Sequence, residues 1–76
     1  MGKKKIITQQ IALHRVKHEE AKGLIEDYIL QNSLPIRIIT GHSSRMREIV
    51  IATLIEHGFE YESIITLPYI TVLKEI

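Results

Sequence analysis

The sequence of 76 residues has no cysteine, no tryptophan, only two prolines and no long apolar run. Without cysteine the chain can form neither a disulfide framework nor a thiolate metal site, and it has no thiol nucleophile. Its apolar runs are much shorter than the roughly 20 residues that a membrane-spanning helix needs. The start has a basic head but no secretory apolar core or cleavage site. We therefore expect a cytoplasmic protein that does not bind a membrane.

The length allows one domain and no more. At this size a single core only just offsets the chain entropy, so the domain can hold about two layers and no deep cavity. We divide the chain into a polar and basic head, residues 1–8, and one α/β domain, residues 9–76. No linker or repeat separates further units. We expect this domain to stand alone and to be a monomer.

Acidic residues are missing from two stretches, residues 1–18 and residues 28–47. The first carries five lysines and arginines, and the second carries three arginines. The remaining residues are net acidic, so the whole chain has a net charge of only +1. Whether the two basic stretches form one surface depends on the fold.

The first half of the domain has the pattern of a strand, a helix and a strand. Residues 10–14 alternate as in a short strand. From His18, apolar residues recur at helical spacing up to the polar segment before Pro35, and they are Ala21, Leu24, Ile25 and Tyr28. The run of residues 36–40 is β-branched and nearly all apolar, which is typical of a central strand with at least one covered face.

The second half predicts a helix and two strands. Gly41 supplies a turn, and Ser43 or Ser44 can cap a helix that stops at Gly58. Its expected buried stripe is Met46, Ile49, Val50, Thr53 and Leu54. Residues 59–76 contain two strand-like runs broken at Leu67-Pro68. The order β-α-β-α-β-β predicts a two-layer sandwich with a mixed sheet, in which the first two strands are parallel and both helices cover one face.

This topology would bring basic residues from both loops to one end of the sheet. The carboxyl ends of parallel strands lie together, and open α/β sheets commonly bind ligands there. The start of a helix offers backbone N–H groups to an anion such as phosphate. Alternation also places Arg37 on the sheet face away from the helices. The predicted anion-binding residues are His14, Arg15, Arg37, Gly41, His42, Ser43, Ser44, Arg45 and Arg47.

Two short motifs stand at these strand ends. The first is Ile11-Ala12-Leu13-His14, followed by Glu19-Glu20-Ala21, and the second is Thr40-Gly41-His42-Ser43. In this order of elements they resemble the Smr domain, the small MutS-related module. That family has Leu-Asp-x-His after its first strand, a helix that opens with Glu-Glu-Ala or similar, and Thr-Gly-x-Gly or His-Gly-x-Gly after its second strand. The resemblance spans about residues 9–76.

The resemblance implies a module that binds DNA or RNA by structure rather than by sequence. Some members of the family nick DNA or cleave RNA. This chain departs from the family pattern at Ala12, where the family has its acid, and at Ser43, where it has a second glycine. The family's glycine-rich link before the last strand is shortened here to residues 67–69. If Ile11 and Leu13 point into the core, Ala12 faces the open side of the sheet.

The missing acid leaves the chemistry open. Phosphodiester hydrolysis needs an activated water or hydroxide, a proton for the leaving oxygen and cations against the developing charge. His14 and His42 are the candidate acid and base, because imidazole titrates near neutrality. RNA cleavage by the substrate's own 2′-hydroxyl would need no carboxylate. We expect no cofactor and no metal site, with Mg²⁺ involved only if the domain is a nuclease.

Three functions therefore remain. The first, which we expect, is a nucleic-acid-binding module that has lost the catalytic acid. The second is an active small endonuclease that uses His14 and His42. The third is a protein-interaction module on the same fold, which the small net charge of +1 keeps open.

Overall fold

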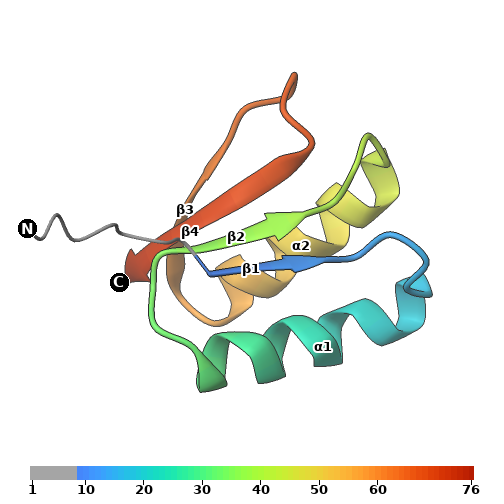
Figure 1. The fold of residues 1–76 in the computed structure, drawn as a ribbon. Coiled ribbons are helices and arrows are strands. Elements are labelled where there is room, and N and C mark those ends of the chain that lie inside the picture. The colour runs from blue at the N-terminus through green and yellow to red at the C-terminus, as the bar shows by residue number, and fades with distance from the viewer. Residues whose placement is uncertain (1–8) are drawn as a thin grey trace, which may run out of the picture.

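The structure, a computed structural model, describes residues 9–76 and contains two helices and four strands there. In chain order these elements are β1 (Gln9–Ala12), α1 (His18–Gln31), β2 (Ile36–Ile39), α2 (Ser44–Glu56), β3 (Phe59–Ser63) and β4 (Tyr69–Glu75). The predicted order of elements is confirmed (Figure 1). The basic head predicted for residues 1–8 lies outside the described residues.

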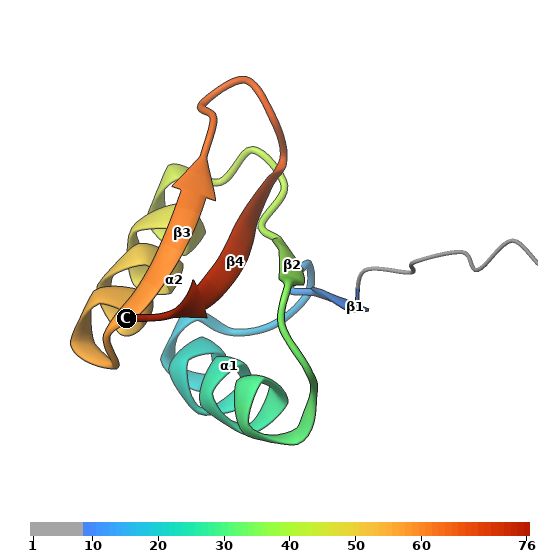
Figure 2. The same ribbon diagram turned by 90° about the vertical axis from the view of Figure 1, so that its left-hand side faces the viewer.

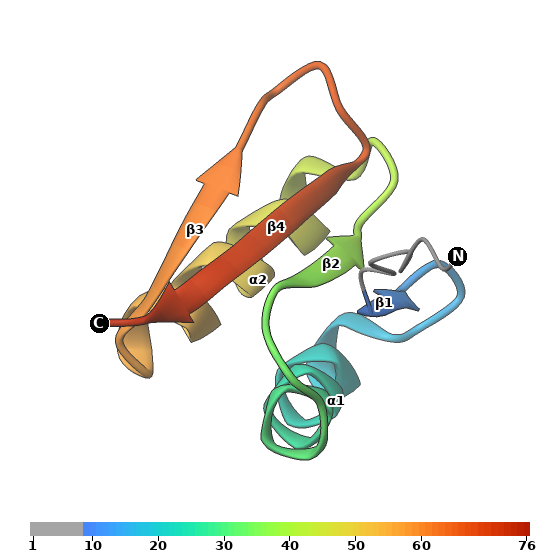
Figure 3. The ribbon, with the colours of Figure 1, turned by 60° about the vertical axis from the view of Figure 1, so that its left-hand side comes forward.

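The four strands form one mixed sheet in the order β1-β2-β4-β3. β1 and β2 are parallel neighbours, as predicted, and β4 is antiparallel to both β2 and β3. Figure 3 shows the strands side by side in this order. β2 is central, and its Ile38 lies opposite Ile11 of β1 and Ile70 of β4.

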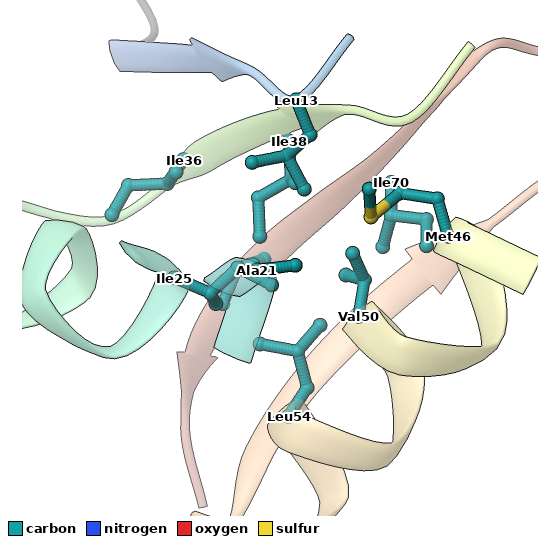
Figure 4. Close-up of a cluster of buried hydrophobic side chains, with 10 residues drawn as sticks. Leu13, Ala21, Ile25, Ile36, Ile38, Met46, Val50, Leu54 and Ile70 are labelled. Atoms are coloured by element: carbon teal, nitrogen blue, oxygen red, sulfur yellow. The ribbon is translucent and has the colours of Figure 1, made fainter. Parts of the chain in front are cut away.

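Both helices pack on the same face of the sheet, which confirms the two-layer sandwich. Ile36 and Ile38 of β2 and Ile70 and Val72 of β4 are fully buried on that face. They belong to one cluster with residues from both helices and the loop after β1 (Figure 4), namely Leu13, Ala21, Ile25, Met46, Val50 and Leu54. The opposite side of the sheet, which we call the open face, is covered by no helix of the described chain.

One helix residue departs from the predicted packing. Ala21 and Ile25 form the buried centre of α1, whereas Leu24 is 40% exposed. Leu24 lies on the flank of α1, because a helix that contacts a sheet along one line buries only a narrow stripe. In α2 the predicted stripe is confirmed, with Ile49 only partly buried at its edge.

An exposed ion pair joins the two helices. Lys22 Nζ of α1 lies 2.9 Å from Glu56 Oε1 of α2. The hydrogen bond from Lys22, and then its charge, hold the pKa of the Glu56 carboxyl below its ordinary value. Both side chains remain about half exposed, so the burial of apolar residues, and not this pair, holds the helices together.

The break between the last two strands is longer than the sequence predicted. β3 ends at Ser63, and residues 64–68 form a turn in which Leu67 N–H donates to Ile64 O at 2.9 Å. Ile64 and Ile65 are therefore exposed in a loop, Ile65 by 83%.

Neither helix of the described chain is long and apolar enough to cross a membrane.

The one-sided core leads to a prediction for two neighbouring isoleucines of β2. Ile38→Ala should lower the free energy of unfolding by about 2–5 kcal/mol, because it empties a fully buried position. Ile39→Ala, its matched control on the half-exposed open face, should cost about 1 kcal/mol. Urea denaturation of both variants measures this difference, and equal losses would contradict a sheet covered on one side.

Candidate functional site

The loops that follow β1 and β2 leave the sheet at the same end (Figure 1). Leu13 N–H donates to Ile39 O at 2.9 Å, so the two strands stay paired up to their last residues. His14 and Arg15 then lie exposed in the first loop, and Arg15 has a positive φ of 70°. His42 lies exposed in the second loop. The structure thus places both predicted histidines at one end of the sheet.

The loop after β2 is held by the loop between β3 and β4. The N–H groups of Thr40 and Gly41 both donate to Pro68 O, at 2.9 and 3.0 Å, and Figure 2 shows the two loops next to each other. Gly41 has a φ of 67°, a backbone conformation that residues other than glycine rarely adopt. A Cβ built on it would meet no atom within 4 Å. The turn therefore favours glycine through its backbone conformation, and the space beside it is open.

The start of α2 offers unused backbone donors. Ser43 is the N-cap, and its hydroxyl accepts from Met46 N–H at 3.1 Å. Helix geometry leaves the N–H groups of Ser44 and Arg45 without an acceptor inside the helix. The first turn contains no acid. The side chain of Arg45 is 68% exposed and lies 3.6 Å from Glu48, a loose surface contact that leaves its charge available.

Arg47 has a different environment from the one that the sequence suggested. Its guanidinium donates to Ser63 Oγ at 2.7 Å and also to the backbone oxygen of Leu67. The side chain is half-buried and ties α2 to the end of β3 and to the loop between β3 and β4. Two of its nitrogens are therefore already used within the protein, which makes Arg45 the better candidate for an external anion.

A shallow hollow lies beside the start of α2. Its lining mixes cationic, acidic and apolar side chains, namely His42, Ser44, Arg47, Glu48, Ile51 and Ile65. His14 and Arg15 do not line it. The structure therefore brings the two histidines to the same end of the sheet but not into one hollow, and the hollow contains a carboxylate that the sequence analysis did not include.

Arg37 lies on the open face, as predicted, and has a partner that the sequence analysis missed. Its guanidinium carbon lies 4.2 Å from the centre of the Tyr69 ring. Arg37 Nε is covered and has no hydrogen-bond partner within residues 9–76. Alternation with Ile70 places Tyr69 on this face, but only the pairing of β2 with β4 brings its ring to Arg37.

The described residues supply no metal centre. Over residues 9–76 no three histidines or acids come close enough to hold a metal ion. Ala12 is exposed on the open face, in register with Ile39. Position 12 is thus accessible to solvent, and its side chain has no polar atom. No family model, no curated protein and no solved structure matches this chain.

The two arginines of α2 lead to a matched prediction on stability. Arg47→Met should lower the free energy of unfolding by about 1–3 kcal/mol, because it leaves the partly buried acceptors Ser63 Oγ and Leu67 O without this donor. Arg45→Met, two positions earlier and exposed, should change it by less than about 0.5 kcal/mol. Thermal and urea melts compare them. If the two variants melted alike, Arg47 would not hold the loop.

Proposed function

We propose that this domain binds nucleic acid, DNA or RNA, at the end of the sheet where β1 and β2 finish. The observation that carries the proposal is the acid-free stretch of residues 28–47, whose last part forms an exposed loop and a helix start. Next to it lies the loop with His14 and Arg15. The resemblance to Smr domains points in the same direction.

Phosphate is the ligand that this surface suits. Free N–H groups at the start of α2 favour an anion, and the helix dipole adds a partial positive charge there. Arg45 and Arg15 are exposed and can contact phosphates of the same backbone. These groups carry no information on base sequence, so binding at this end follows the shape and charge of the nucleic acid.

A specific observation supports a second candidate function, a protein-interaction module. Ile65 is 83% exposed and lines the same hollow as His42. Contiguous exposed apolar patches mark protein contacts, and Ile65 is preceded by Ile64, which is 46% exposed. Glu48 in that hollow also reduces its attraction for phosphate. The two functions differ in the salt dependence of binding, which is steep only for nucleic acid.

The first prediction from this proposal concerns charge. Changing Arg15 and Arg45 together to glutamine should flatten the slope of log K against log salt by roughly 1–2, because each lost phosphate contact removes about 0.9 on duplex DNA. Titration of labelled RNA and DNA at several salt concentrations measures the slope. Lys74→Gln, at the other end of the sheet, is the control and should leave it unchanged. A wild-type protein without salt-dependent binding would favour the protein-interaction module.

The second prediction concerns catalysis. We expect the wild type to bind without cutting, or to cut feebly, and Ala12→Asp to increase cleavage of DNA or RNA. Because Ala12 is exposed on the open face, the new carboxylate avoids the several kcal/mol that burial without a partner would cost.

Gels with and without Mg²⁺ measure cleavage, and a thermal melt checks each variant. The gain should vanish when His14 is also changed to alanine, and Ala12→Asn, which has the same shape without the charge, should show no gain. Efficient cleavage by the wild type that His14→Ala abolishes would instead establish an endonuclease that needs no carboxylate at position 12.

A further inference from the structure

The open face carries a stacked arginine and tyrosine that do not belong to the proposed phosphate contacts. Arg37 of β2 and Tyr69 of β4 stack diagonally across the two central strands, 4.2 Å from guanidinium carbon to ring centre. In Figure 3 the strands β3 and β4 lie in front of α2, so the viewer looks onto this face. The covered Nε shows that the arginine lies along the sheet instead of extending into solvent.

The charge of Arg37 has no counter-ion in the described structure. No carboxylate of residues 9–76 lies within ion-pair distance of its guanidinium, and residues 1–8 contain no acid. A charge that is covered from water normally has a partner of opposite sign, and the covered Nε of Arg37 has none within residues 9–76. The half-buried guanidinium, stacked on an aromatic ring, therefore suits a ligand that is both planar and negatively charged.

The surroundings of the stack indicate how such a ligand would lie. Across the open face, Gln10, Arg37, Thr71 and Glu62 follow one another in register on the four strands. Gln10 and Thr71 offer hydrogen-bonding groups on either side of Arg37. The carboxylate of Glu62 repels phosphate on the β3 side, so an anionic backbone would follow the β1 side, which leads to the loop of His14 and Arg15.

We propose that the stack of Arg37 and Tyr69 is a platform for an unpaired base, which makes single-stranded nucleic acid the preferred ligand of this domain. A base can stack on a guanidinium plane or an aromatic ring, and the phosphate of the same nucleotide can pair with the positive charge of Arg37. A paired base inside a duplex cannot present its flat side to a protein. This inference rests on the proposed function and narrows its substrate class.

The test compares single and double strands. Labelled oligo(U), oligo(dT) and a duplex of about 12 nucleotides, a length within the usual site size, are titrated against wild type and variants. Tyr69→Leu should weaken single-strand binding by about 5- to 150-fold, the equivalent of one lost stacking contact, and leave duplex binding within about twofold. Tyr69→Phe, which keeps the ring, should bind like the wild type.

Two arginine variants separate stacking from charge. Arg37→Lys keeps the cation but loses the plane, so single-strand affinity should fall while the slope of log K against log salt stays the same. Arg45→Gln, at the proposed phosphate contacts, should weaken single and double strands alike. Thermal melts check that each variant is folded.

A measurement on the wild type covers the case in which Tyr69→Leu does not fold. In NMR spectra, a saturating single strand should shift the Tyr69 ring protons and the Arg37 Nε–H signal, and the duplex should leave them in place. Absence of a shift with the single strand would overturn the proposal.

The outcomes also separate this inference from the function on which it rests. A wild type that binds no nucleic acid overturns both. Binding that Arg45→Gln weakens and Tyr69→Leu does not affect leaves the proposed function and overturns the platform, as does an equal loss for single and double strands. Sedimentation could also reveal a wild-type dimer that Tyr69→Leu converts to a monomer. That result would show that a second copy covers the open face, and it would overturn the platform.

Discussion

The alternation of side chains along β2 is the constraint on which the rest of the structure depends. Ile36 and Ile38 are fully buried under the two helices, so Arg37 and Ile39 must face the other side. Because β2 pairs with both β1 and β4, its register also determines which of their residues share each face. A slip by one residue would turn Arg37 and Ile39 toward the helices and expose Ile36 and Ile38. The core and the open face therefore follow from the same strand.

The candidate phosphate contacts lie on a braced part of the chain. Thr40 and Gly41 are hydrogen-bonded to Pro68 O, and Arg47 holds the same last loop from α2. Loops positioned by a rigid scaffold are suited to binding, because little order has to be gained when a ligand arrives. The net charge of the chain is only +1. Any positive charge at this end of the sheet therefore depends on where the fold places a few exposed arginines.

Most of the fold could be predicted from the sequence, but the site could be predicted only in part. Periodicity located both helices and the central strand because burial on one face selects residues at fixed spacing. It failed for Ile64 and Ile65, whose β-branched side chains suggest strand although the turn closed by Leu67 exposes them. It placed Arg37 correctly but did not single out Tyr69, since the stack joins residues on different strands.

The sequence by itself determined the order of the helices and strands, the face on which each strand residue lies, and the absence of thiols and of a carboxylate at position 12. These properties depend on residue identity and local spacing alone. Only the tertiary structure decided that Arg47 is used by Ser63 and Leu67, 16 and 20 residues away, while Arg45 stays exposed. Two arginines two positions apart on one helix look alike in sequence. They differ in the fold because they point in directions about 200° apart around the helix, toward a packed loop and toward solvent.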